Sequence, residues 1–290
     1  MLFLKLLLVP GLVALVTLAV RRWGPAVGGW LAGLPIVAGP VLVFYALEQG
    51  NAFAARAAQA TLAGLVATVA FAVTYARGSR RLPWYVCVAI GWTAFAGGIV
   101  SLHALQPGLV VSLVLLIAAT LAGRRMLRRV RFAEPGLRTE AYVGRFAEPG
   151  LRTEAYVGRV PAPKPRSGEG GDPPGDLLIR LLATATLVLV LTGLAGRLGP
   201  AWSGLLNAFP VLTTIVAAFS HAQRGAAAAV AFLNGYLQAI VGFGLFCVVM
   251  ATGVEALGLG WALAAALAAQ LAWHAGLVTR TARSARDSRS

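Results

Sequence analysis

The apolar residues of this chain fall in nine long blocks, and this feature limits most strongly how the chain can fold. Each block has about 19 residues or more, enough for a helix to cross a hydrocarbon layer of about 30 Å. Helices are the open-chain structure that satisfies its own backbone hydrogen bonds in lipid. We therefore predict an all-α integral membrane protein with about nine transmembrane helices, at Leu2–Val20, Val27–Leu47, Ala52–Ala76, Pro83–Leu102, Ala104–Ala122, Asp176–Ala195, Pro200–Ser220, Gly225–Thr252 and Leu257–Val278.

Composition and charge agree with a membrane protein. Hydrophobic residues make up 58% and charged residues 12% of the chain, against about 45–50% and about 25% in an average soluble domain. If the spans alternate, all basic residues except Lys5, Arg56 and Arg197 fall on one side. The positive-inside rule then places the N-terminus outside and the C-terminus in the cytoplasm. Because the net charge of +15 is explained by orientation, we predict no nucleic-acid partner.

The predicted spans are divided by a polar central segment. We expect a first membrane half at residues 1–122, a flexible cytoplasmic linker at 123–175, a second half at 176–279 and a basic cytoplasmic tail at 280–290. The linker contains the 14-residue string RFAEPGLRTEAYVG twice, at Arg131–Gly144 and Arg145–Gly158. Such a copy is either a docking motif presented twice or a duplication tolerated because loops accept insertions at small entropic cost. The duplication is therefore assigned no chemistry.

The two halves resemble each other at an offset of 175 residues. Without a gap, ten of the 29 pairs from Arg22/Arg197 to Gly50/Gly225 are identical. The identities include Gly29/Gly204 and Pro35/Pro210, and matched glycine and proline carry specific backbone requirements. We predict that the halves are repeats of four helices each.

The repeats are predicted to be inverted. The matched spans are the second and the seventh, so an odd number of crossings separates them and they run in opposite directions. The fifth span belongs to neither repeat and brings the chain to the correct side. Inverted repeats with Gly- or Pro-interrupted helices are common in secondary transporters, whose substrate sites lie near the midplane.

Interrupted helices in the second and seventh spans mark the predicted substrate site. Proline removes a backbone donor within a helix, and hydroxyl or amide side chains nearby can satisfy the freed groups or contact a solute. The alternative is a simple kink relieved by neighbouring helices. The predicted substrate-binding residues are Pro35, Gly39, Pro40, Gln59, Asn207, Pro210, Thr213, Thr214 and Asn234.

Two further pairs of polar residues have a functional and a structural interpretation. Gln59 and Asn234 are equivalent under the offset of 175 and could converge on one site, or each could make an interhelical hydrogen bond. Glu48 and Arg56 lie near the outer ends of the second and third spans, where they form either an outer gate or a solvated ion pair.

The sequence offers no constellation for catalysis, a metal or a cofactor. It contains no HExxH, GxSxG or P-loop motif. Cys87 and Cys247 both lie in apolar blocks, so neither a disulfide framework nor a CxxC metal site is indicated. We predict that the protein is not an enzyme and has no cofactor.

The string from Arg21 to Gly50, RRWGPAVGGWLAGLPIVAGPVLVFYALEQG, resembles that of uncharacterised bacterial inner-membrane proteins. Its portion from Ala32 to Gly50 is similar to the small GlpM-like four-span membrane proteins. In the second half AGLP becomes NAFP and Glu48 becomes Gln223. The resemblance implies a fused pair of four-span units in the bacterial inner membrane, without a known substrate.

The leading prediction is a permease or exporter of a small solute, with its site between the second and seventh spans. The alternative is a membrane scaffold or assembly factor that acts through its linker, and an intramembrane enzyme or lipid-handling protein remains a third class. The expected partners are the lipid bilayer and an unidentified small solute, and the sequence leaves a homo-oligomer open.

Overall fold

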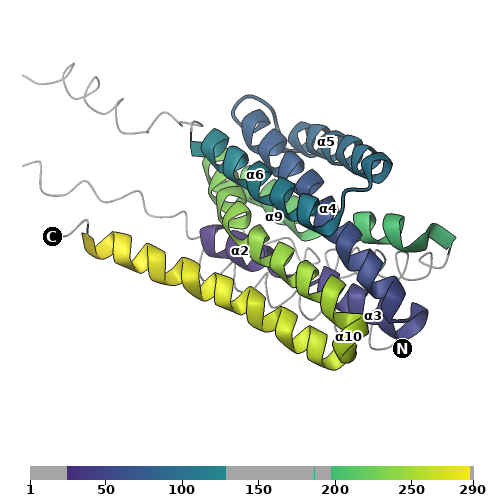
Figure 1. Cartoon of the computed structure of the whole chain (residues 1–290). Coiled ribbons are helices and arrows are strands. Elements are labelled where there is room, and N and C mark those ends of the chain that lie inside the picture. The colour runs from purple at the N-terminus through teal and green to yellow at the C-terminus, as the bar shows by residue number, and fades with distance from the viewer. Residues whose placement is uncertain (1–24, 129–185, 187–196, 288–290) are drawn as a thin grey trace, which may run out of the picture. The chain divides into compact units, whose positions relative to one another are not determined.

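The computed structural model describes residues 25–128, 186 and 197–287, and in these ranges the chain is helical without a β-strand. The labelled helices are shown in Figure 1, and a helix at residues 197–207 precedes α9. Their bounds are α2 Pro25–Ala32, α3 Ala38–Gln49, α4 Asn51–Gly78, α5 Trp84–Leu105, α6 Leu109–Arg128, α9 Val211–Arg224 and α10 Ala226–Asp287.

Within the described ranges, five helical segments are long and apolar enough to cross a membrane. They are Asn51–Gly78, Trp84–Leu105, Leu109–Leu127, Arg197–Arg224 and Ala226–Leu277. The predicted all-helical architecture, with apolar helices of membrane-spanning length, is confirmed for these residues, and the total of nine spans stays a prediction. The predicted spans Leu2–Val20 and Asp176–Ala195, together with nearly all of the linker, lie outside the described residues, apart from Thr186 in the second of these spans.

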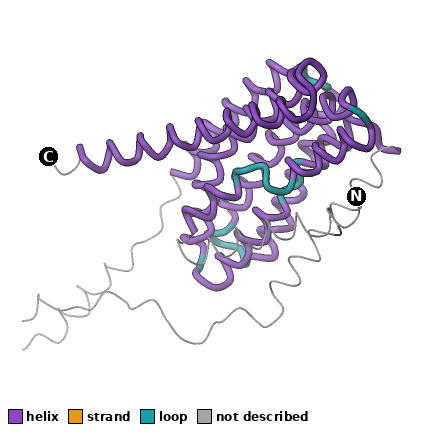
Figure 2. Tube along the Cα trace, turned by 90° about the horizontal axis from the view of Figure 1, so that it is seen from below, coloured by secondary structure: helices purple, strands orange, loops and turns teal. Residues whose placement is uncertain are grey.

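α10 folds back on itself and contains two of the predicted spans. Gly258 has φ 77° and ψ 163° inside it, a conformation that glycine adopts readily and other residues do not. Beyond this point Trp273 Nε1 donates a hydrogen bond of 3.1 Å to the carbonyl oxygen of Gln238. Figure 2 shows the arrangement from below. α10 is therefore a helical hairpin, with its arms joined near Gly258.

α4 and α10 form the centre of the described bundle (Figure 1). The apolar side chains of α4 are mostly buried, including Leu62, Leu65 and Phe71. α5 and α6 instead expose many apolar side chains, such as Val110 and Val111. Helices that are apolar on their exposed face suit a lipid environment, since lipid is the solvent for that face.

Helix ends that the predicted topology places on one side of the membrane are neighbours in the structure. At one end, the first turns of α4 lie beside His103 of α5 and Pro200 of helix 197–207. At the other, the Tyr75 hydroxyl near the end of α4 lies 3.3 Å from Nδ1 of His221 in α9. Helices that run alternately up and down the bundle bring these ends together on each side.

Candidate functional site: two helix breaks and a polar cavity

The predicted interruption of the second span is present between α2 and α3. Pro35 lacks an N–H group and disfavours helical geometry in the residue before it. Leu34 N–H therefore reaches back to Leu31 O at 3.0 Å, and Ile36 N–H bonds to Leu34 O at 2.8 Å. The helix resumes as Gly39 N–H donates to Pro35 O at 2.8 Å. The chain thus leaves the helix for about one turn and re-enters it.

The second interruption, between helix 197–207 and α9, repeats this pattern. Phe209 N–H bonds to Leu206 O at 2.9 Å, and Val211 N–H bonds to Phe209 O at 2.8 Å. Thr214 N–H then donates to Pro210 O at 2.8 Å. Each of these bonds is the bond of the first break moved by 175 residues, so the two breaks share one local backbone conformation.

Side chains from neighbouring helices satisfy the carbonyl groups that the breaks release. In the first break, the Gly33 carbonyl accepts from Gln270 Nε2 at 3.3 Å. In the second, the Ala208 carbonyl accepts from Thr68 Oγ1 at 2.8 Å, and the Thr61 hydroxyl is shared between the Gly204 carbonyl at 3.0 Å and the Ala57 carbonyl of its own helix at 2.8 Å. A buried carbonyl without a partner costs about 1–3 kcal/mol. These three side chains therefore stabilise the breaks.

Asn207 joins the two breaks. Its Nδ2 donates to the carbonyl oxygen of Ala38 and to Thr61 Oγ1, at 3.3 Å in both cases. The side chain is buried, and its Oδ1 has no hydrogen-bond partner in the described part of the chain. An unpaired buried acceptor of this kind is available to a bound solute or water.

A small cavity of about 50 Å³ lies between the breaks. Its lining takes Leu34, Ile36 and Ala38 from the first break and Asn207 and Thr213 from the second. The lining residues at 32, 34 and 36–38 all have their equivalents under the offset of 175, at 207, 209 and 211–213, in the same lining. The two breaks thus face each other across this space.

We call the space between the breaks the central cavity. Of the other predicted site residues, one lines this cavity and the rest lie elsewhere in the bundle. Pro210 lines the central cavity, whereas Pro35, Gly39 and Pro40 line an apolar cavity of about 460 Å³ beside the first break. Thr214 accepts a hydrogen bond of 3.1 Å from Trp92 Nε1. Asn234 lines neither of these two cavities, although its Oδ1 is buried without a partner among the described residues.

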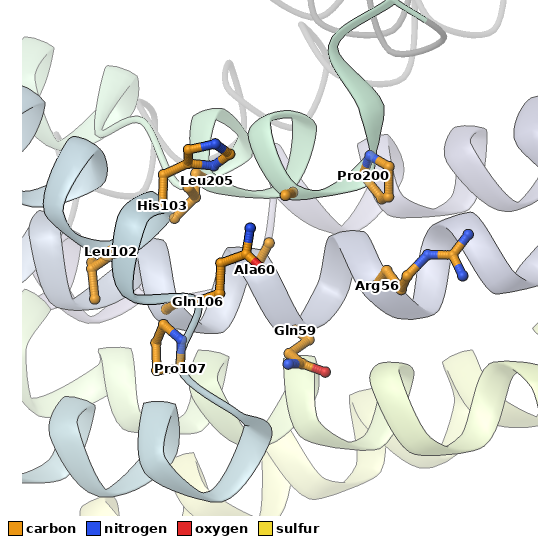
Figure 3. A pocket seen from close by; sticks show the side chains of 11 residues that line it. Arg56, Gln59, Ala60, Leu102, His103, Gln106, Pro107, Pro200 and Leu205 are labelled. Atoms are coloured by element: carbon orange, nitrogen blue, oxygen red, sulfur yellow. The ribbon is translucent and has the colours of Figure 1, made fainter.

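A third cavity, of about 260 Å³, lies at the end of the bundle where α4 begins (Figure 3). Arg56 and Gln59 line it from α4, and His103 and Gln106 line it from the end of α5. The His103 ring stacks on Trp202 with ring centroids 4.1 Å apart. We call this space the polar cavity. Its lining includes Gln59 of the predicted substrate site and Arg56 of the predicted gate, whereas Glu48, the other predicted gate residue, is exposed and is not in its lining.

Thr61, Thr68 and Gln270 are not among the residues that the sequence predicts for the site. Thr61 and Thr68 are seven residues apart, which places them on one face of α4 two turns from each other. This spacing was the available signal, since polar residues on the buried face of a span need partners. Their partners are carbonyl groups of the other half, which no local pattern identifies.

Comparison with known proteins gives no assignment: no family model, curated protein or solved structure matches the chain.

Proposed function

We propose that this protein is a membrane permease or exporter of a small solute, whose path passes between the two helix breaks. The observation that carries the proposal is the shared cavity between two breaks of the same conformation. Paired interrupted helices release backbone groups inside the protein, where a desolvated substrate can use them. The Asn207 Oδ1 atom supplies an additional acceptor there.

Reciprocal packing supports the proposal that the halves are inverted repeats. Gly29 packs against the Phe232 backbone, and its equivalent Gly204 packs against the backbone of Ala57, the equivalent of Phe232. Contacts exchanged in this way are expected of two units related by a pseudo-twofold axis. Each unit then places its interrupted helix on the long helix of the other.

The direction of the central helices also supports inversion. A methyl group on Gly244 of α10 would lie 3.3 Å from Leu62 of α4. One on Gly123 of α6 would lie 3.4 Å from Leu237 and 3.5 Å from Val69. Gly244 of α10 therefore lies level with Leu62 of α4, and Leu237 of α10 lies level with Val69 of α4. Residue numbers decrease along α10 in the direction in which they increase along α4, so α4 and the first arm of α10 are antiparallel. α6, the proposed fifth span, packs against both of them.

The size of the central cavity favours a mechanism in which the halves move. Pockets that bind organic ligands usually have volumes of about 300–1,000 Å³, and this one has about 50 Å³. A path between the breaks must therefore open by movement of one repeat against the other, as in alternating access.

We propose the full arrangement as nine spans in the bacterial inner membrane, with the N-terminus outside.

The proposal predicts a ligand whose transport depends on Asn207. Full-length protein in detergent would be screened for thermal stabilisation by metabolites and ions, since a ligand at 100 times its Kd stabilises by about 2.7 kcal/mol. The ligand found would then be followed into proteoliposomes. Asn207→Ala should reduce its uptake at least tenfold because the amide between the breaks is lost.

Asn51→Ala is the matched control, because Asn51 lies in the first turn of α4 away from the breaks. Thermal melting and elution of each variant would establish that it is folded. A ligand transported equally by both variants would contradict a path between the breaks. If no compound stabilises the protein, and if deletion of residues 131–175 abolishes the function of the protein in cells, the scaffold hypothesis is favoured instead.

A further inference from the structure

We propose that the polar cavity binds a small organic monocarboxylate at the end of the bundle where α4 begins. The inference names a substrate class for the proposed transporter. It rests on the proposed transport function in one respect: the monocarboxylate that binds is assumed to be the solute that is transported. The binding site itself is argued from the lining of this cavity alone.

Arg56 gives the polar cavity its charge. Arg56 is an exposed residue of the lining; it is the one lining residue with a formal charge, and no carboxylate is among them. The guanidinium group offers a planar fork of donors that matches a carboxylate. Gln59 lies three residues further along α4 and adds an amide to the lining, and its side chain and that of Arg56 point in different directions (Figure 3). A single cation favours a monoanion over a multiply charged ligand.

Helix 197–207 adds to the positive potential. Gly199 near its start has φ 70°, outside helical geometry, so the regular turns follow it, and Pro200 and Ala201 line the cavity. The start of a helix carries a partial positive charge, which stabilises a nearby anion. Pro200 has no N–H group, so this helix start adds a weak positive potential to the charge of Arg56 and no donor from Pro200.

The rest of the lining fits an organic group. Ala60, Ala63, Leu102 and Leu205 supply apolar surface. His103 is held against Trp202, so this wall has a fixed aromatic face. A volume of about 260 Å³ accommodates a few carbon atoms beside a carboxylate. Inorganic anions would leave this apolar surface without a partner.

The two halves differ at this site. Under the offset of 175, Arg56 corresponds to Ala231, and Leu205 corresponds to Trp30. Trp30 packs edge-on against His274, with ring centroids 5.5 Å apart. The equivalent place in the other repeat therefore lacks the arginine and carries a larger side chain. The anion site belongs to one end of the bundle.

The test is isothermal titration of the full-length protein in detergent with acetate, butyrate and benzoate. Chloride would keep the ionic strength constant, and acetamide, butyramide and benzamide would serve as neutral analogues. We expect at least one carboxylate to bind and its amide not to bind. Arg56→Gln should weaken this binding at least tenfold, whereas Arg56→Lys should retain part of it because the charge remains.

Arg197→Gln is the matched control, since Arg197 is an exposed arginine like Arg56 but is outside the cavity lining. It should leave the affinity unchanged. Equal binding by Arg56→Gln, equal binding of the amides, or binding of none of the three carboxylates would overturn the proposal. The same titrations would be repeated in phosphatidylcholine nanodiscs with and without phosphatidylglycerol. Binding of phosphatidylglycerol that depends on Arg56, without binding of any carboxylate, would also overturn the proposal.

This experiment is separate from the transport test. Binding is measured at equilibrium and needs no movement of the halves, so it survives if the protein carries nothing. Transport of a neutral solute that depends on Asn207 but not on Arg56, with no carboxylate bound, would support the path between the breaks and refute the carboxylate site.

Discussion

Replacing Gly204 by valine is expected to prevent recovery of folded protein. A Cβ atom at position 204 would overlap the carbonyl oxygen of Ala57, which belongs to the backbone of α4 and cannot rotate away. Overpacking usually costs about 1–3 kcal/mol and more where backbone must move, out of a total stability of about 5–15 kcal/mol. Gly29→Val should behave alike, because its Cβ would meet the Phe232 carbonyl.

The measurement is gel-filtration recovery and thermal melting of the detergent-purified variants. Gly97→Val is the control, because a Cβ on Gly97 in α5 has no neighbour within 4 Å. In helices valine is favoured over glycine by a few tenths of a kcal/mol, so this variant should melt close to the unmodified protein. Normal recovery of Gly204→Val would show that helix 197–207 does not approach α4 this closely.

Thr61→Val is expected to lower the free energy of unfolding by about 2–6 kcal/mol, because two buried polar groups lose a partner at about 1–3 kcal/mol each. The fully buried Thr61 hydroxyl lies 3.0 Å from the Gly204 carbonyl and accepts from Asn207 at 3.3 Å. Valine has a similar shape without the hydroxyl, so it leaves both partners in an apolar surrounding. Chemical denaturation or thermal melting measures the loss.

Two variants decide whether the hydroxyl is responsible. Thr61→Ser keeps the hydroxyl and should recover most of the stability. Thr93→Val should change little, because the exposed Thr93 hydroxyl bonds only to Ala89 O within its own helix, at 3.0 Å. A Thr61→Val protein as stable as Thr93→Val would mean that the break does not depend on α4.

The sequence predicted the breaks well because proline acts locally. Pro35 and Pro210 lack a donor wherever they occur, so an interruption near each follows from chemistry that needs no partner. The glycines that end the next helices are similar: Gly50 and Gly225 have φ of 90° and 83°. Such positions are recognisable from sequence because the backbone requires that residue type.

The placement of side chains between helices could not be predicted in this way. Gln59 lines the polar cavity and Asn234 does not, although the two are equivalent in sequence. If the repeats are inverted, equivalent positions on α4 and α10 lie toward opposite ends of the bundle. Two equivalent residues then lie close together only where they are near the pseudo-twofold axis that relates the repeats, as the two breaks are. Gln59 as a substrate-binding residue and Arg56 as part of an outer gate stay predictions.

Side-specific labelling of two equivalent positions tests the inverted arrangement most directly. Gln49 and Arg224 are both exposed, are 175 residues apart, and end α3 and α9. The native cysteines Cys87 and Cys247 are buried, so Gln49→Cys and Arg224→Cys would each add one reactive thiol. Intact cells would be treated with a membrane-impermeant maleimide before and after permeabilisation. Inverted repeats predict labelling of Gln49→Cys in intact cells and of Arg224→Cys only after permeabilisation; labelling of both from the same side would contradict the arrangement.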